Sequence, residues 1–142
     1  MYVLCKEGFV STVLWNGKRV IDVAQQRAIE AASRRREPIV VVRSRHPDTL
    51  PALFRHLGRD VPTFSTEPPS DYPYRAYLAR SEWAELLVGM ANQLDYDNVK
   101  DWFDRENPAQ AELAHAIWEA TVDAAAGRTQ RFSWEEGDLK LV

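Results

Sequence analysis

Apolar residues dominate positions 2–14, and only the turn signal at Glu7-Gly8 interrupts them. Val, Leu, Phe and Tyr on both sides of a short turn predict a β-hairpin. A tight turn at Asn16-Gly17 should follow. In residues 22–36 the apolar positions recur every three or four residues, which predicts a helix with Asp22 as its N-cap. Three arginines, at positions 34–36, lie at its C-terminal end, where cations suit the helix dipole.

Residues 39–45, after the helix-breaking Pro38, carry the strongest strand signal of the chain. Their inner part is apolar at consecutive positions, which predicts a central strand buried on both faces. Because strand side chains alternate, Arg43 and Arg45 should project on the same side. Residues 48–57 then show apolar side chains at i, i+3, i+4 and i+7, the spacing of an amphipathic helix capped by Asp48 and ended by Gly58.

The middle of the chain adds two weaker strand signals. Residues 61–66 could form a strand, and a Pro-Pro loop occupies residues 67–71. Residues 72–79 read as a further strand, in which Pro73 favours an edge strand or the first position. Ser81 is the expected N-cap of a helix with one apolar stripe, formed by Trp83, Leu86, Leu87, Met90 and Leu94.

The last third is predominantly helical in pattern. Residues 95–104 look like a turn leading into a short helix. Asn107-Pro108 predicts the start of a longer helix, which carries Trp118 on its apolar stripe and ends before Gly127. In the tail, residues 128–142, only 131–134 resemble a strand. We expect this tail to be partly mobile or to add an edge strand.

Because strands come early and helices accumulate late, the pattern predicts an α+β fold with a single small antiparallel or mixed sheet. Helices are expected on one face of that sheet, and a ferredoxin-like layout is the closest common model. The 142 residues, 45% of them hydrophobic and 27% charged, match one globular domain over residues 1–142.

Charge and cysteine content narrow the function classes. The net charge of −3 argues against a protein that coats extended nucleic acid or an anionic membrane. Cys5 is the single cysteine, so no intramolecular disulfide can form, and we expect a buried thiol in a cytoplasmic protein. The start lacks a signal-peptide pattern, and no apolar run reaches the roughly 20 residues of a membrane span. We therefore expect no membrane partner.

Catalytic and metal motifs are missing from the sequence. His46, His56 and His115 have no second ligand at a zinc-binding spacing. The six glycines never cluster into a phosphate loop, and no serine lies in a Gly-x-Ser-x-Gly motif. Acidic residues do gather late in the chain and could hold magnesium or calcium, although helix caps and solvated helix faces explain them as well: Asp95, Asp97, Asp101 and Asp104. We expect no cofactor, no metal and no catalysis.

Three features could bind an anion. Arg43 and Arg45 on rigid strand backbone offer bidentate donors, although an exposed strand face also explains them. A second feature combines rings with a cation, although a half-buried edge strand would show the same pattern: Tyr72, Tyr74, Arg75 and Tyr77. The third feature lies beside a predicted helix start, where backbone N–H groups can receive an anion, and local capping explains only part of it: Tyr96, Asn98 and Lys100.

Residues 71–75 (Asp-Tyr-Pro-Tyr-Arg), 95–100 (Asp-Tyr-Asp-Asn-Val-Lys) and 116–118 (Ala-Ile-Trp) together resemble a family of small uncharacterised α+β proteins of bacteria and their phages. The likeness covers residues 40–120. Val99 stands where Phe is usual in that family, and residues 18–37 read as an insertion. The resemblance implies a compact α+β fold and an accessory role, such as sequestering a host defence signal.

Four functions follow from these observations. The first is non-enzymatic binding of an anionic, nucleotide-like small molecule that bears phosphate. The second is a protein-interaction module or inhibitor of a host protein that uses tryptophan anchors. A metal-dependent phosphodiesterase built on Asp95, Asp97 and Asp101 is third. RNA binding is fourth, disfavoured by the acidic balance. We also expect a homodimer, since small chains often complete a pocket at a two-fold interface.

Overall fold

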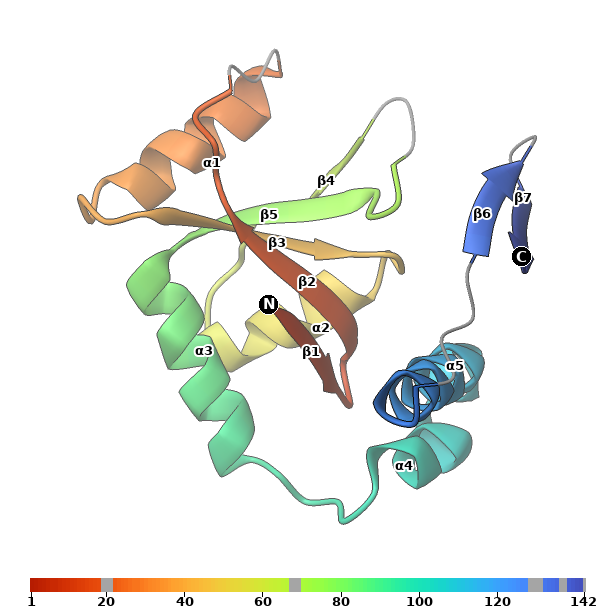
Figure 1. Cartoon of the computed structure of the whole chain (residues 1–142). Coiled ribbons are helices and arrows are strands. Elements are labelled where there is room, and N and C mark those ends of the chain that lie inside the picture. The colour runs from red at the N-terminus through yellow and green to blue at the C-terminus, as the bar shows by residue number, and fades with distance from the viewer. Residues whose placement is uncertain (19–21, 67–69, 128–131, 136–137, 142) are drawn as a thin grey trace. The chain divides into compact units, whose positions relative to one another are not determined.

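The computed structural model describes residues 1–18, 22–66, 70–127, 132–135 and 138–141 (Figure 1). The chain divides into two compact units, residues 1–97 and 98–142, and each is described by itself. Compact units need not be independently folding domains. A single domain over residues 1–142 therefore stays a prediction.

The first unit contains one five-stranded sheet in which every neighbouring pair is antiparallel. In spatial order its strands are β1 (Tyr2–Cys5), β2 (Gly8–Leu14), β3 (Ile39–Ser44), β5 (Tyr74–Ala79) and β4 (Phe64–Ser65). The α+β class and the antiparallel sheet are confirmed, as are the hairpin of β1 and β2 and the central place of β3. At the start of β2, Gly8 has a φ of 129°, a backbone conformation that residues other than glycine rarely adopt.

Three α-helices accompany this sheet: α1 (Val23–Ser33), α2 (Thr49–Phe54), which continues as the 3-10 helix Arg55–Leu57, and α3 (Arg80–Asn92). Asp22 caps α1 as predicted, because its carboxylate accepts hydrogen bonds from the backbone N–H groups of Ala24 and Gln25. Gly58 ends the α2 segment in the left-handed conformation, also as predicted. Asp48 occupies the N-cap position of α2 but makes no side-chain capping bond.

Helices cover both faces of the sheet, which corrects the expectation of one covered face (Figure 1). On one face Val40 and Val42 of β3 pack with α2 and α3 in the larger core cluster. On the other face Ile39 and Val41 pack with Ile29 of α1. Each fully buried aliphatic side chain stabilises the fold by roughly 1.5–3 kcal/mol. The five-stranded order and the helix on the second face also differ from a ferredoxin-like layout.

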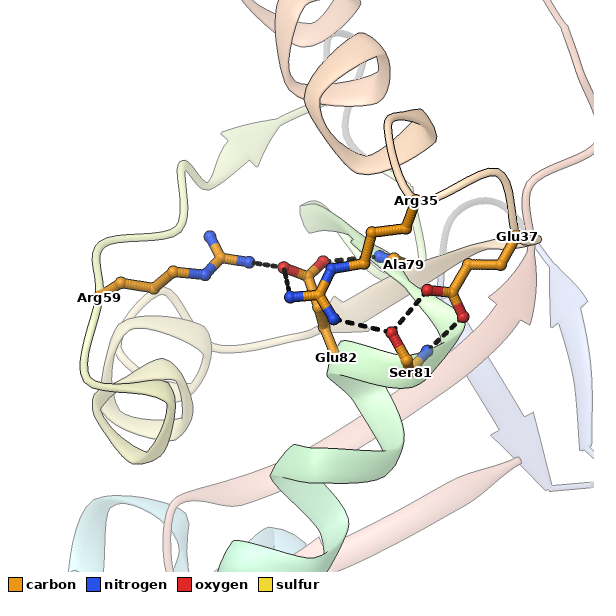
Figure 2. Close-up of polar contacts among 6 residues, drawn as sticks. All are labelled: Arg35, Glu37, Arg59, Ala79, Ser81 and Glu82. Carbon is orange, nitrogen blue, oxygen red and sulfur yellow. Dashed lines mark hydrogen bonds and ion pairs between the residues drawn. The ribbon is translucent and has the colours of Figure 1, made fainter.

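The start of α3 differs from the prediction. Ala79, not Ser81, is the N-cap residue, and an alanine offers no side-chain acceptor to the first turn. Glu82 compensates at the third helical position, because its carboxylate accepts the Ala79 backbone N–H at 2.8 Å. Ser81 instead donates its hydroxyl to Glu37 at 2.5 Å and its backbone N–H to the same carboxylate at 2.8 Å (Figure 2). These bonds lower the pKa of Glu37, chiefly through the Ser81 hydroxyl.

The Glu82 carboxylate is also the meeting point of two arginines (Figure 2). Arg59, from the loop after Gly58, donates to it, and Arg35, from the connection between α1 and β3, lies 3.7 Å away. Arg35 also donates to the Ser81 hydroxyl at 2.9 Å. The carboxylate is only 11% exposed, so these contacts join three distant stretches of chain at one nearly buried acid.

The two weaker strand predictions, for residues 61–66 and 72–79, agree with the structure only in part. Of residues 61–66 only β4 (Phe64–Ser65) is extended in the sheet. Residues 67–69, in the predicted Pro-Pro loop, lie outside the described residues. Pro73 directly precedes β5, and β5 lies between β3 and β4, so the edge alternative is wrong. A proline just before a strand removes no ladder hydrogen bond from it.

The second unit contains α4 (Val99–Glu106), α5 (Pro108–Ala125), β6 (Phe132–Glu135) and β7 (Asp138–Leu141). Both helices were predicted, and Phe103 of α4 and Ala114 of α5 are buried. Asn107 is at the N-cap of α5 without a side-chain capping bond. Strands β6 and β7 pair with each other in a two-stranded sheet, so these two strands are not part of the five-stranded sheet. Residue 131, the start of the expected strand, lies outside the described residues.

Replacing Glu82 by Ala should lower the free energy of unfolding by about 1–3 kcal/mol, because the buried Ala79 N–H loses its acceptor. The two partly exposed arginines add less, since solvent screens them. Urea denaturation followed by tryptophan fluorescence measures the change. Glu85→Ala, an exposed position on the same helix, should stay within about 0.5 kcal/mol of the unmodified chain. Equal losses from both variants would contradict this account.

Candidate anion-binding site

Two arginines face each other across the centre of the sheet in the first unit. Arg43 of β3 and Arg75 of β5 are direct partners in the antiparallel register, and Ser11 of β2 is the partner of Arg43 on its other side. Side chains on adjacent strands at paired positions share one face. This is the face that carries Val41 and Tyr77, where α1 packs at the opposite end of the strands. The register thus places two guanidinium groups on neighbouring strands.

The Tyr72 ring links Arg43 of this pair to a third cation, Arg45. The Cζ atoms of Arg43 and Arg45 each lie 5.0 Å from the centroid of the Tyr72 ring. Such cation–π contacts contribute about 0.5–1 kcal/mol at exposed sites and more where water is excluded. Arg45 is exposed, whereas Arg43, Arg75 and Tyr72 are half-buried.

The polar partners of these arginines are neutral hydroxyl groups. Arg43 donates to the Ser11 hydroxyl at 2.7 Å, and Arg75 donates to the Ser70 hydroxyl at 3.2 Å. The Nε atoms of Arg43 and Arg75 are buried without a hydrogen-bond partner. Within the described part of the chain, none of the three arginines forms an ion pair with a carboxylate. The cluster therefore holds positive charge that the described residues leave uncompensated.

Like charges at paired positions of a sheet repel each other and destabilise it. The Tyr72 ring and the serine hydroxyls offset part of this cost. A bound anion would offset more, because a guanidinium presents several N–H donors in a planar fork that fits phosphate or carboxylate oxygens. The arrangement is therefore chemically suited to binding an anion.

A row of aromatic rings continues from Tyr72 toward the edge of the sheet. Phe9 lies 6.4 Å from Tyr72 between ring centroids, and Tyr2 stacks on Phe9 at 5.7 Å with an interplanar angle of 10°. Tyr2 is 66% exposed, so its ring is available to a flat ligand. We name this surface the arginine–tyrosine face; its members are Tyr2, Phe9, Ser11, Arg43, Arg45, Ser70, Tyr72 and Arg75.

Sequence reasoning did not find Tyr2, Phe9, Ser11 or Ser70. The hairpin was predicted, but its register against β3 is set by tertiary pairing and cannot be read from local pattern. Alternation within β2 does place Phe9 and Ser11 on one side. This alternation points to the site only when the pairing of Ser11 with Arg43 is known.

The structure brings together Arg43, Arg45, Tyr72 and Arg75 from the predicted site residues, whereas Tyr74 and Tyr96 lie elsewhere in the first unit. Tyr74 lies on the opposite face, against the larger core cluster. Tyr96 lines a different cavity of the first unit.

Asn98 and Lys100 belong to the second unit. The Asn98 side chain caps α4 by accepting the Lys100 backbone N–H at 3.0 Å. The Lys100 Nζ lies 3.6 Å from the centroid of the Trp118 ring. Trp118 was expected on a core stripe but is 47% exposed, whereas Trp83 is buried as expected.

Two of the four clustered aspartates have separate partners among the described residues. Asp95 forms an ion pair with Lys6 at 3.3 Å, and Asp104 contacts His115 at 3.0 Å. Asp95 and Asp97 lie in the first unit, and Asp101 and Asp104 in the second. Among the residues with described positions, no three His, Cys, Asp or Glu side chains gather as metal ligands.

A small cavity of about 190 Å³ lies between the hairpin and α3. It contains a close pair of nearly buried groups, the His56 Nε2 and the Glu7 carboxylate, 2.6 Å apart. Cys5 also lines it, and burial raises the pKa of that thiol to about 12. Burial likewise raises the pKa of Tyr96. At neutral pH Cys5 is thus protonated and poorly nucleophilic, as expected of a buried structural cysteine.

Cys5 should resist thiol reagents in the folded chain. With a pKa of about 12, its thiolate fraction at pH 8 is small, and burial also blocks access. We expect Ellman's reagent to react at least about 100-fold more slowly with the native chain than with the chain in denaturant. Since Cys5 is the single cysteine, the signal belongs to it alone. Equal rates in both states would show an accessible, ionised thiol instead.

Comparison with protein-family models, with curated proteins and with solved structures found no match to this chain. The resemblance to the bacterial and phage family therefore stays a prediction. Among the described residues, no helix is both long and apolar enough to cross a membrane.

Proposed function

We propose that this protein is a non-enzymatic binding protein for an anionic, nucleotide-like small molecule, held on the arginine–tyrosine face. One observation carries the proposal: Arg43 and Arg45 lie against the Tyr72 ring, Arg75 is the strand partner of Arg43, and within the described residues no carboxylate pairs with these arginines. A phosphate-bearing ligand would supply the missing negative charge.

Rigid placement supports this role. Arg43 and Arg75 project from paired positions of β3 and β5, so little backbone freedom is lost when both contact one ligand. Hydrogen bonds to charged groups contribute about 1.5–3 kcal/mol each. Two arginines acting together would therefore supply several kilocalories per mole to a phosphate group.

The aromatic row supports the nucleotide-like character of the ligand. The exposed Tyr2 ring, backed by Phe9, offers a flat surface beside the cations. Stacking of a base on an aromatic side chain contributes about 1–3 kcal/mol. A ligand with a ring at one end and phosphate at the other would use both halves of the face.

Binding rather than catalysis fits the groups of this face. Guanidinium groups stay protonated at physiological pH, and phenol and serine hydroxyls are poor bases there. The face as described thus has positioning groups for an anion without a general base. If the ligand is a host signal, as the resemblance implies, a protein of this kind would act by sequestering it.

An interaction module is the second candidate, and Trp118 favours it. This residue of α5 is 47% exposed, with Val122 one turn later 38% exposed. Exposed tryptophans often anchor protein interfaces. A stoichiometric partner captured from lysate, and lost on Trp118→Ala, would support this candidate.

Calorimetric titration with nucleoside monophosphates, diphosphates and triphosphates and with cyclic nucleotides tests the anion-binding proposal. We expect at least one to bind, and Arg75→Ala to weaken it by roughly 10-fold or more, since 1.4 kcal/mol corresponds to a factor of ten. Arg75→Lys should recover only part of the affinity, because an ammonium lacks the planar fork.

Arg34→Ala is the matched control for this titration. Arg34 is an exposed arginine at the end of α1, so its loss should leave the affinity unchanged. If no nucleotide gives heat, or if Arg34→Ala and Arg75→Ala weaken binding equally, the arginine–tyrosine face is not the site. Thermal melts of each variant verify that the sheet is intact.

A further inference from the structure

A second hollow lies on the sheet face that carries Tyr77, between α1 and the segment that runs from Arg59 to Phe64. Its volume is about 430 Å³, within the range of small-molecule sites in proteins. Its walls include Tyr77, Phe64, Val61 and Pro62. None of the eight members of the arginine–tyrosine face lines it, so it is a separate site from the one proposed above.

The hollow exists because α1 presents small side chains to it. Four alanines of α1 line the cavity, at positions 24, 28, 31 and 32. On the other face of the sheet, α2 and α3 fill the equivalent space with Leu50, Leu53 and Leu86, all fully buried. Natural interiors are close-packed, so an apolar hollow of this size next to a core cluster has room for a guest.

Three charged side chains also line this largely apolar cavity. Arg27, Arg59 and Glu82 belong to its lining. Glu82 already accepts from the Ala79 N–H and from Arg59, with Arg35 nearby, so it has little capacity left for a cationic guest (Figure 2). Arg27 is exposed and makes no hydrogen bond or ion pair within the described part of the chain. The lining thus has an excess of one positive charge.

We propose that this cavity binds a small amphiphilic monoanion, an apolar body that carries one carboxylate. The body lies against the alanines of α1, Phe64 and Tyr77, and the carboxylate faces Arg27 and Arg59. Apolar burial supplies the affinity, at about 0.8 kcal/mol per buried methylene group. The guanidinium groups supply the preference for a negative head group.

Decanoate is the probe for this site, with decylamine and decanol as controls of the same chain length. In calorimetric titrations of the full chain, below concentrations at which the probes self-associate, we expect decanoate to bind one site. Decylamine should bind at least about 10-fold more weakly, because it meets the guanidinium groups instead of a free carboxylate. Decanol should fall between the two.

Two variants separate the parts of the proposal. Ala28→Leu puts a branched side chain into the cavity and should weaken decanoate at least about 10-fold. Arg27→Gln should leave decanol binding unchanged and reduce the preference for decanoate over decanol. Arg34→Gln, the same substitution at the C-cap of α1 and outside the lining, is the matched control and should leave the binding of all three probes unchanged.

Several outcomes would overturn this inference: no heat with decanoate, equal binding of decanoate and decylamine, or full affinity in both Ala28→Leu and Arg27→Gln. Arg27 is exposed, so Arg27→Gln should stay folded, and its melt checks this. Arg75→Ala should not affect decanoate, and decanoate should not compete with nucleotides. Failure here would therefore leave the nucleotide proposal untouched, and the reverse also holds.

Discussion

The first unit depends on burial of β3 on both faces. Val40 and Val42 face the core cluster formed with α2 and α3, and Ile39 and Val41 face α1. A one-residue slip would exchange the two faces of the strand and turn Arg43 toward the core cluster of α2 and α3, where its charge would be buried without a partner. Its register against β2 and β5 is thereby specified. This register also fixes the positions of the side chains at the C-terminal end of β3.

Arg43 is at that end, and this explains why the arginines meet. Once the apolar part of β3 is in register, Arg43 must lie beside Ser11 on one side and Arg75 on the other. The apolar packing further along β3 and β5 thus holds two like charges together against their repulsion. Binding sites often contain groups whose proximity costs free energy without a ligand and which the packed core holds in place.

Local pattern was sufficient for most elements. The hairpin, β3, the Asp22 cap of α1 and the ends at Gly58 and Gly127 follow from short-range chemistry. Ser81 was misread because serine is a good cap in general, whereas Glu37, distant in sequence, engages it here. Trp118 fits an apolar stripe yet is exposed, since periodicity does not say how much of a helix is covered. The contact of Arg43 with Tyr72, and the row of rings that continues from Tyr72 through Phe9 to Tyr2, depend on strand register, which no local signal supplies.

The positions of the charged side chains, rather than the net charge of the chain, determine which ligands it can bind. The net charge of −3 alone would favour cationic partners. Several carboxylates of the first unit, however, already face a cationic or imidazole side chain: Glu7 with His56, Asp95 with Lys6, and Glu82 with Arg59. The arginines of β3 and β5 have only hydroxyl and ring partners among the described residues. Since screening limits the reach of distant charges to about 8–10 Å, an approaching ligand responds mainly to this local excess, and that excess is positive.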